Sequence, residues 1–384
     1  MTAPTARDAP RIPVRPVPRP PLERLLRRPG TRAVLLAGSR DPNAKLTVVL
    51  IDDYGPSFVV KVPTTRAAAR VVQREGAILR RLAELGLGSL ATTLPRPLGY
   101  LEHCGLPALA CTALLGTPMS VGYHGWRHTA RRRSVGADLR IAGDWLADLQ
   151  RRTAGPTAPV TLLADALDAI GRRFPDHPGL PAALPRLAAA ACRLAAERTP
   201  RTVVHGDYWF GNLLVDRGRV VGVVDWECGQ PAGEPLRDVA RFAVSYALYL
   251  DRHVAPGARV PGHRSLRADR WGAGIAHAAA GRGWFGELVH EHVSGALERL
   301  GANGGRWREV LLAGVADVAA TADHPGFARD HLNLLIELAG DPADPPAPGV
   351  VAAGDESPGE ESTGVTDVSG DEPTGVTDPA GALR

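Results

Sequence analysis

Three polar side chains between residues 205 and 225 have the types and the spacing that phosphoryl transfer requires. Asp207 lies five residues before Asn212, and Asp225 follows the apolar run of residues 220–224. Phosphoryl transfer needs a base that orients the attacking hydroxyl group and oxygen ligands that hold magnesium. Two carboxylates and one amide supply these groups, whereas an isolated Asp would be an ordinary turn former. The combined pattern predicts a magnesium-dependent phosphotransfer site.

The residues around these three side chains resemble a known family. Residues 205–215 read H-G-D-Y-W-F-G-N-L-L-V, and residues 223–227 read V-V-D-W-E. Both segments resemble the aminoglycoside phosphotransferase and choline kinase superfamily, and they follow the order of the protein-kinase catalytic and metal loops. The resemblance covers roughly residues 30–340. It implies that Asp207 is the catalytic base, that Asn212 and Asp225 bind Mg²⁺, and that ATP or GTP is the phosphoryl donor.

Neighbouring residues are interpreted as supporting this site. Residues 233–240 read G-E-P-L-R-D-V-A, which resembles a G-x-P-x-x-D-L-A segment of the family, and Asp238 within it is interpreted as structural. His205 is interpreted as orienting the loop, because a kinase needs only the Asp as its proton acceptor. Glu227 is open to two interpretations, since it can reach the metal or the substrate, or it can cap the next turn.

A lysine and a glutamate are predicted to form the nucleotide side of the site. Lys61 lies near the end of the strand of residues 58–62, where a kinase β3 lysine would lie. Glu75 interrupts the apolar stripe of the helix predicted over residues 65–85, whereas Glu84 lies on its wet face. A carboxylate within an apolar stripe is costly unless it is paired. A Lys61–Glu75 ion pair accounts for both positions, and the alternative is a solvated Glu75 at the edge of the stripe.

The remaining nucleotide contacts are expected from two segments. The connection of residues 38–43 carries one glycine and no G-x-G-x-x-G motif, so Gly38 and Ser39 are the candidates for phosphate contact there. The adenine is expected against the backbone of residues 111–114, which includes Cys111 and Ala113. This second expectation follows from the family resemblance alone.

The elements that must position these residues indicate an α+β, protein-kinase-like fold with two lobes. Residues 1–29 are predicted to be a disordered Pro/Arg-rich tail, and residues 343–384 a disordered acidic tail. The N-terminal lobe, residues 30–116, is predicted as a small antiparallel sheet with one helix. The C-terminal lobe, residues 117–342, is predicted to be mainly helical, with a β-rich island over residues 202–225. The strands are expected at 32–37, 46–51, 58–62, 97–102 and 107–113, and the helices of the C-terminal lobe near 135–152, 161–173, 181–197, 236–250, 285–300 and 306–322.

The composition excludes several other classes of protein. The 384 residues carry a formal net charge of +4, but the run of Arg131 to Arg133 has no interleaved aromatic residues, so we expect a solvated face and no nucleic-acid partner. No apolar stretch is long enough to span a bilayer and no signal peptide is present, which predicts a cytoplasmic protein without a membrane partner. The four scattered cysteines suggest neither a zinc site nor a disulfide framework.

We therefore expect an enzyme that transfers the γ-phosphoryl group of ATP or GTP to a hydroxyl group of a small molecule, such as an aminoglycoside, in antibiotic resistance or natural-product biosynthesis. Mixed charge on the helices after Asp225 leaves the acceptor open, and the sequence leaves the oligomeric state open. One alternative is a kinase of a peptide or another metabolite. The other is a nucleotide-binding pseudokinase scaffold, which the sparse glycine loop would fit. Only Lys45 and Lys61 are lysines, and every other basic side chain apart from histidine is arginine.

Overall fold

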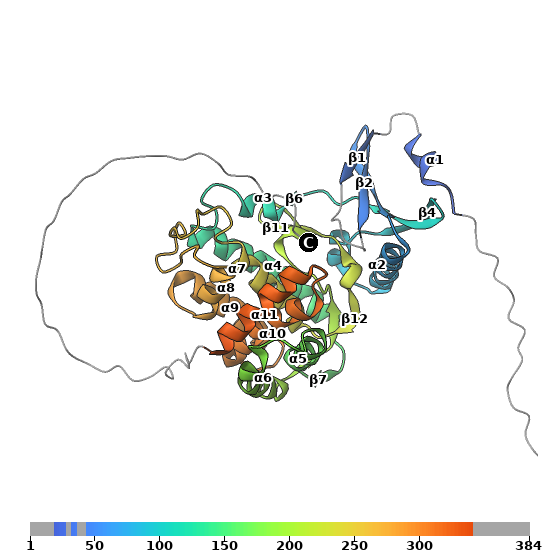
Figure 1. Ribbon diagram of the computed structural model, residues 1–384. Helices are drawn as coiled ribbons and strands as arrows, with labels where there is room; N and C mark the ends of the chain where they lie inside the picture. The colour runs from blue at the N-terminus through green and yellow to red at the C-terminus, as the bar shows by residue number, and fades with distance from the viewer. Residues whose placement is uncertain (1–18, 28–31, 37–43, 341–384) are drawn as a thin grey trace, which may run out of the picture.

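The computed structural model describes residues 19–27, 32–36 and 44–340, which form a smaller β-rich lobe beside a larger helical lobe (Figure 1). The sheet of the smaller lobe has the strand order β1-β2-β3-β5-β4, and all neighbouring strands are antiparallel. The predicted α+β fold class with an antiparallel N-terminal lobe is confirmed. Its strands are β1 (Arg32–Leu36), β2 (Lys45–Asp52), β3 (Gly55–Pro63), β4 (Pro97–His103) and β5 (Leu106–Thr112).

The register of β2 against β3 brings both lysines to one face of the sheet. Thr47 lies opposite Lys61, and Lys45 precedes Thr47 by two residues. Side chains two residues apart on a strand point to the same face, and diagonal neighbours across an antiparallel pair remain within reach of long side chains. Lys45 and Lys61 therefore extend from the same face of the sheet.

Helix α2 (Arg66–Glu84) packs against this sheet and carries Glu75. The helix begins where the Thr65 side chain accepts a hydrogen bond from the backbone N–H of Ala68, as expected of an N-cap. Its buried face includes Val72, Ile78 and Leu79, and Glu75 lies within this face at 1% exposure. The predicted helix and the predicted position of Glu75 in its apolar stripe are confirmed.

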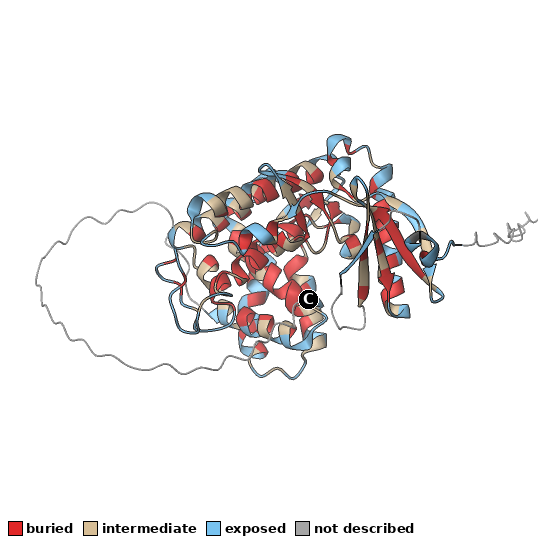
Figure 2. Ribbon diagram, turned by 90° about the horizontal axis from the view of Figure 1, so that it is seen from above, coloured by how far each residue is buried: buried red, intermediate tan, exposed pale blue. Residues whose placement is uncertain are grey.

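The larger lobe is mainly helical, and its core lies between the helices, where buried residues concentrate (Figure 2). The six predicted helices of this lobe are present within a few residues of their expected ends. Three further helices, α3, α8 and α11, were not predicted as separate elements. The helices are α3 (Met119–Tyr123), α4 (Arg132–Arg152), α5 (Leu162–Arg173), α6 (Leu180–Ala195), α7 (Leu236–Leu248), α8 (Ala273–Ala279), α9 (Gly283–Arg299), α10 (Trp307–Thr321) and α11 (Pro325–Gly340).

Short strands in the larger lobe hold the predicted chemical loops. The hairpin of β10 and β11 turns at Arg217 and Gly218, whose φ angles of 46° and 72° suit the tight turn of a two-residue hairpin loop. Strand β12 pairs with β9, β6 pairs with β10, and β7 pairs with β8. These strands are β6 (Thr117–Pro118), β7 (Thr157–Pro159), β8 (Arg198–Pro200), β9 (Thr202–Val204), β10 (Leu213–Asp216), β11 (Arg219–Val223) and β12 (Gln230–Gly233).

One expectation for the N-terminal tail is wrong, because residues 22–26 form a helix, α1 (Leu22–Leu26). Leu22 is buried with Leu50, Val60 and Ala108 in a small cluster on the sheet, so α1 covers apolar side chains that would otherwise face water.

Residues 1–18, the connection of residues 37–43 and the acidic tail lie outside the described residues. Within the described part of the chain, every helix is too short or too polar to cross a membrane.

Candidate functional site

The loop after β9 is fixed by a carboxylate from α7. Asp238, which is fully buried, accepts hydrogen bonds from the backbone N–H groups of His205 (2.7 Å) and Gly206 (2.8 Å). Gly206 has a φ of 81°, and a Cβ atom at this position would lie 2.3 Å from the carbonyl oxygen of Cys228. Only glycine fits such a backbone without strain. The interpretation of Asp238 as a structural residue is confirmed by these two hydrogen bonds.

His205 orients the same loop through both of its ring nitrogens. Nε2 lies 2.9 Å from the carbonyl oxygen of Val224, and Nδ1 accepts the backbone N–H of Asp207 at 3.2 Å. A carbonyl oxygen can only accept, so Nε2 carries the proton and the ring is the neutral Nε2–H tautomer. Because both nitrogens are engaged and the side chain is buried, His205 holds the 205–207 and 224–225 backbones together. This arrangement agrees with its predicted role as an orienting residue.

The carboxylate of Asp207 is held on both oxygens. Asn212 Nδ2 donates to Asp207 Oδ2 (3.2 Å) and to its backbone carbonyl oxygen (2.9 Å). Arg241 donates to Asp207 Oδ1 from Nε (2.9 Å), and its Nη2 lies 2.8 Å from the same oxygen. Burial acts to lower the pKa of Arg241, but the Asp207 carboxylate beside it raises the pKa above its usual value.

Sequence reasoning assigned no role to Arg241, although a signal for it exists. Arg241 follows Asp238 by three residues on α7, and residues three apart on a helix lie on the same face. Asp238 contacts the backbone of His205 and Gly206, so a side chain one turn later meets the next residue, Asp207. The helix therefore provides one carboxylate for the loop backbone and one guanidinium for the candidate base.

Asp225 lies at the end of the hairpin in a left-handed backbone conformation, with φ 72° and ψ 58°. This region is sparsely populated by residues other than glycine, and such conformations concentrate at functional sites. The conformation turns the chain immediately before the short 3₁₀ helix Trp226–Cys228. Asp225 Oδ1 receives both lysine side chains, Lys61 at 2.6 Å and Lys45 at 3.2 Å.

The predicted Lys61–Glu75 ion pair is present. Lys61 Nζ lies 2.5 Å from Glu75 Oε1, and the same glutamate oxygen accepts the backbone N–H of Trp226 at 3.2 Å. Burial acts to lower the pKa of Lys61, but the carboxylates of Asp225 and Glu75 raise it above its ordinary value, so the ammonium stays charged. The pair connects the two lobes, because Glu75 also contacts the loop that carries Asp225.

Glu227 has a partner that neither earlier interpretation included. It forms an ion pair with Lys45, a buried residue at the start of β2. Burial lowers the pKa of Lys45, and the Asp225 carboxylate partly opposes this effect. Both lysines of the chain therefore converge on the loop of residues 225–227.

The remaining candidates for nucleotide contact are less well defined. Gly38 and Ser39 lie outside the described residues. Cys111 is buried on β5 opposite Val59, and burial raises the pKa of its thiol to about 12, so the thiol stays neutral at physiological pH. The backbone N–H of Ala113 donates to the carbonyl oxygen of Ser57 at 3.1 Å. A nucleotide contact of Ala113 would therefore use its carbonyl oxygen.

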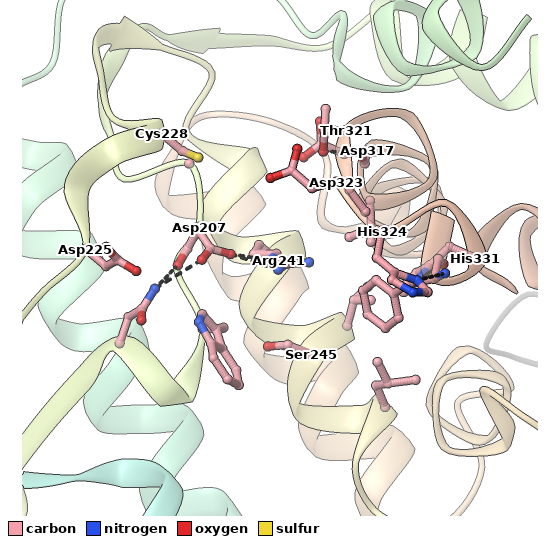
Figure 3. A pocket seen from close by; sticks show the side chains of 18 of the residues that line it. Asp207, Asp225, Cys228, Arg241, Ser245, Asp317, Thr321, Asp323, His324 and His331 are labelled. Atoms are coloured by element: carbon pink, nitrogen blue, oxygen red, sulfur yellow. Dashed lines mark hydrogen bonds and ion pairs between the residues drawn. The ribbon is translucent and has the colours of Figure 1, made fainter. Parts of the chain in front are cut away.

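A cavity of about 280 Å³ opens beside Asp207. Figure 3 shows Asp207 between Asp225 on one side and Arg241 on the other, while Thr321, Asp323 and His324 lie on the far side of the cavity. Asn212 and Lys45 also line it, whereas Lys61, Glu75, Cys111 and Ala113 do not. The predicted base and metal ligands thus face one cavity, whereas Lys61 and Glu75 lie in the N-terminal lobe outside its lining.

The oxygen donors at this cavity fit a magnesium ion. Asn212 uses its Nδ2 group to bind Asp207, so its Oδ1 atom is left for a cation. Asp225 adds a carboxylate, and carboxylate and amide oxygens are ligands that Mg²⁺ accepts. Carboxylate oxygens of Glu75, Asp225 and Glu227 also lie within 4.8 Å of one another, and Lys45 and Lys61 pair with them.

Comparison with known proteins agrees with this geometry. The sequence model of the phosphotransferase enzyme family (APH) matches residues 43–288, well over half of the chain. No protein of curated function matched the chain. Among solved structures, the chain is similar to a thermostable mutant of the aminoglycoside phosphotransferase APH(4)-Ia in its apo form, with 14% identity, a TM-score of 0.50, and coverage of 83% of this chain and 96% of that chain.

Two further solved structures are more distant by TM-score. One is the ADP-bound aminoglycoside phosphotransferase APH(2'')-Ib, with 15% identity, a TM-score of 0.46, and coverage of 83% of this chain and 97% of that chain. The other is the macrolide 2'-phosphotransferase MphH from Brachybacterium faecium, with 18% identity, a TM-score of 0.43, and coverage of 84% and 98%. At 14% identity the likeness to APH(4)-Ia concerns the fold, while the family match covers the segment that contains Asp207, Asn212 and Asp225. The chain belongs to the phosphotransferase enzyme family.

Proposed function

We propose that this chain transfers the γ-phosphoryl group of ATP or GTP to a hydroxyl group of a small molecule, with Asp207 as the catalytic base. The observation that carries the proposal is the carboxylate of Asp207, which is fixed by Asn212 and Arg241, faces the cavity, and lies beside Asp225. Family membership supports phosphoryl transfer as the reaction. Positioning and electrostatic stabilisation are the main contributions that a protein makes to this reaction.

The contacts of Asp207 leave room for the acceptor hydroxyl. A carboxylate has about four lone-pair positions. Arg241 fills two on Oδ1 and Asn212 fills one on Oδ2, so one position on Oδ2 remains for an incoming O–H group. In the reaction the acceptor oxygen forms a bond to the γ-phosphorus, the bond to the leaving nucleoside diphosphate breaks, and the hydroxyl proton passes to Asp207.

Asn212 and Asp225 would hold Mg²⁺ through their oxygens. The bound ion would neutralise charge on the phosphate oxygens during transfer. Lys61, aligned by Glu75, would bind the nucleotide phosphates. The backbone around Cys111 and Ala113 would accept the adenine, with Gly38 and Ser39 as candidates for phosphate contact. Because the donor is a cellular nucleotide, we place the enzyme in the cytoplasm.

The lining of the cavity favours an acceptor with an apolar face as well as hydroxyl groups. Trp209, Tyr249 and Phe327 contribute aromatic rings to the lining. Asp317, which also lines the cavity, is paired with Arg237 at 2.5 Å and so does not present a bare negative charge. A hydroxylated natural product with a hydrophobic ring face fits the aromatic part of this lining.

A transfer screen tests the proposal. Purified protein is incubated with Mg·ATP or Mg·GTP and a panel of macrolides, aminoglycosides, nucleosides, amino alcohols, sugars and hydroxyl-containing peptides, and phosphorylated products are detected by mass spectrometry. We expect a product with a mass increase of one phosphoryl group in one small-molecule class, identifying either a resistance or a biosynthetic substrate. Transfer to peptides alone would contradict the small-molecule assignment. Binding of nucleotide without any transfer would favour a pseudokinase scaffold.

A further inference from the structure

The two lysines of the chain meet at a single oxygen atom. The other basic side chains, histidine apart, are all arginine. Lys45 Nζ and Lys61 Nζ nevertheless both lie within 3.2 Å of Asp225 Oδ1. Lys61 is explained by its pair with Glu75, but the N-terminal lobe needs only one lysine for that pair. Lys45 therefore requires its own explanation.

Lys45 is held in place by the sheet and does not extend from the protein surface. Lys45 is the first residue of β2 and points from the same face as Lys61, because Thr47 is the residue opposite Lys61. It is 4% exposed, and it lines the cavity next to Asp207 and Asn212. An ammonium group is thus held at the boundary between the nucleotide side of the site and the cavity.

Lys45 and Lys61 are two ammonium groups that pair with three neighbouring carboxylates, those of Glu75, Asp225 and Glu227. Two ammonium groups that share one carboxylate oxygen repel each other, and the repulsion is stronger at a buried position than in water. Glu227 offsets part of this repulsion through its ion pair with Lys45. A cation that binds Asp225 would withdraw the oxygen that both lysines use. The two ammonium groups would then need another hydrogen-bond acceptor, and a polyphosphate chain supplies negatively charged oxygens.

We propose that Lys45 is a second phosphate-binding lysine. In the absence of nucleotide it pairs with Asp225 and Glu227, and when a nucleoside di- or triphosphate binds, its ammonium group pairs with the polyphosphate instead. This inference rests on the proposed function, because it assigns a further contact to the same donor. It separates the tasks of the two lysines. Lys61 remains fixed by Glu75, whereas Lys45 exchanges a carboxylate for a phosphate.

Isothermal titration calorimetry with a series of nucleotides tests this assignment. The dissociation constants of ATP, ADP, AMP and adenosine are measured for the wild type and for Lys45→Met, with and without magnesium. Charge-assisted hydrogen bonds are among the stronger polar contacts, so we expect the ATP and ADP constants to rise about tenfold or more. The adenosine constant should not change, because adenosine has no phosphate for Lys45 to bind.

Two further variants control for folding and charge. Lys45→Met leaves the carboxylate of Glu227 without its partner, so the double variant Lys45→Met/Glu227→Gln removes both charges and should show the same selective loss of ATP and ADP affinity. Arg70→Met removes one positive charge from an exposed position of α2 and should leave all four constants unchanged.

The outcomes distinguish this inference from the proposed function. In one set of outcomes the wild type binds nucleotide and transfers phosphate while Lys45→Met loses affinity equally for ATP and adenosine, or for neither. Either result would overturn the role of Lys45 alone. A folded wild type that binds no nucleotide would overturn the inference together with the proposed function.

Discussion

The Lys61–Glu75 pair can be dissected by a double-mutant cycle. The side chain of Glu75 is buried, and its carboxylate has two partners, Lys61 Nζ at 2.5 Å and the backbone N–H of Trp226 at 3.2 Å. Lys61 has a second carboxylate, Asp225, at 2.6 Å. The substitutions Lys61→Met and Glu75→Gln remove one charge each, and the double variant removes both. The two single variants leave different groups unpaired, so their effects on the free energy of unfolding should differ.

The magnitudes follow from what each substitution leaves behind. Lys61→Met leaves a buried carboxylate with one backbone N–H, and removing one partner of a buried pair costs about 3–5 kcal/mol, so we expect a loss of about 3 kcal/mol. Glu75→Gln leaves Lys61 paired with Asp225, so its cost should be smaller, about 1–2 kcal/mol. In the double variant neither charge is stranded. Its loss should therefore be smaller than the sum of the single losses by about 2 kcal/mol.

Urea denaturation, followed by circular dichroism, gives the free energy of unfolding of all four proteins. The prediction requires slopes against denaturant that agree among the variants, so that the differences reflect stability. If the losses of the two single variants add to that of the double variant within about 0.5 kcal/mol, Lys61 and Glu75 do not interact in solution. Such a result would refute the reasoning that a buried carboxylate on α2 depends on the lysine of β3.

Two further predictions concern the loop and the core. Gly206→Ala should lower the free energy of unfolding by at least about 2 kcal/mol and abolish transfer, because a Cβ atom would clash with the backbone of Cys228. Gly218→Ala, at a φ of 72° with open space around it, should lower it by only about 1 kcal/mol. Thermal denaturation compares the two variants, and equal costs would contradict this account. Burial lowers the pKa of His292 to about 4, so between pH 6.5 and about 4 the unfolded state binds more protons than the folded state. The free energy of unfolding should therefore decrease by up to roughly 3 kcal/mol as the pH is lowered from 6.5 to about 4. Denaturation of wild type and His292→Gln across this window checks the sign, since the variant should lose less stability as the pH falls, and parallel curves would show that His292 does not contribute.

The residues of the site could be predicted from sequence where a local rule constrains them. Glu75 was identifiable because a carboxylate in the apolar stripe of a helix needs a partner, and Lys61 was the lysine on the adjacent strand. The β-rich island predicted over residues 202–225 contains the hairpin of β10 and β11, whose turn residues Arg217 and Gly218 have positive φ angles. Each of these predictions depends on neighbours that are close in sequence or on one periodicity.

Features that depend on distant segments were not predicted. Arg241 reaches Asp207 across 34 residues, and sequence analysis assigned it only to a group of mixed charges. Lys45 was noted for its rarity, but its contact with Asp225 spans 180 residues and depends on how the two lobes meet. Helix α11 supplies Phe327 and His331 to the cavity, yet it was not separated from the helical region that precedes it. Local sequence patterns do not predict how the two lobes or distant helices pack against each other.

The central claim, that Asp207 is the base of a phosphotransferase, is tested most directly by the kinetics of Asp207→Asn with the acceptor identified in the screen. The account predicts that kcat falls by roughly 10²–10⁴, the usual contribution of a positioned base, while the dissociation constant of Mg·ATP stays within about twofold of that of the wild type. The amide keeps the size of the side chain and removes its ability to accept the hydroxyl proton. An Asp207→Asn protein that transfers phosphate at the wild-type rate would contradict the account.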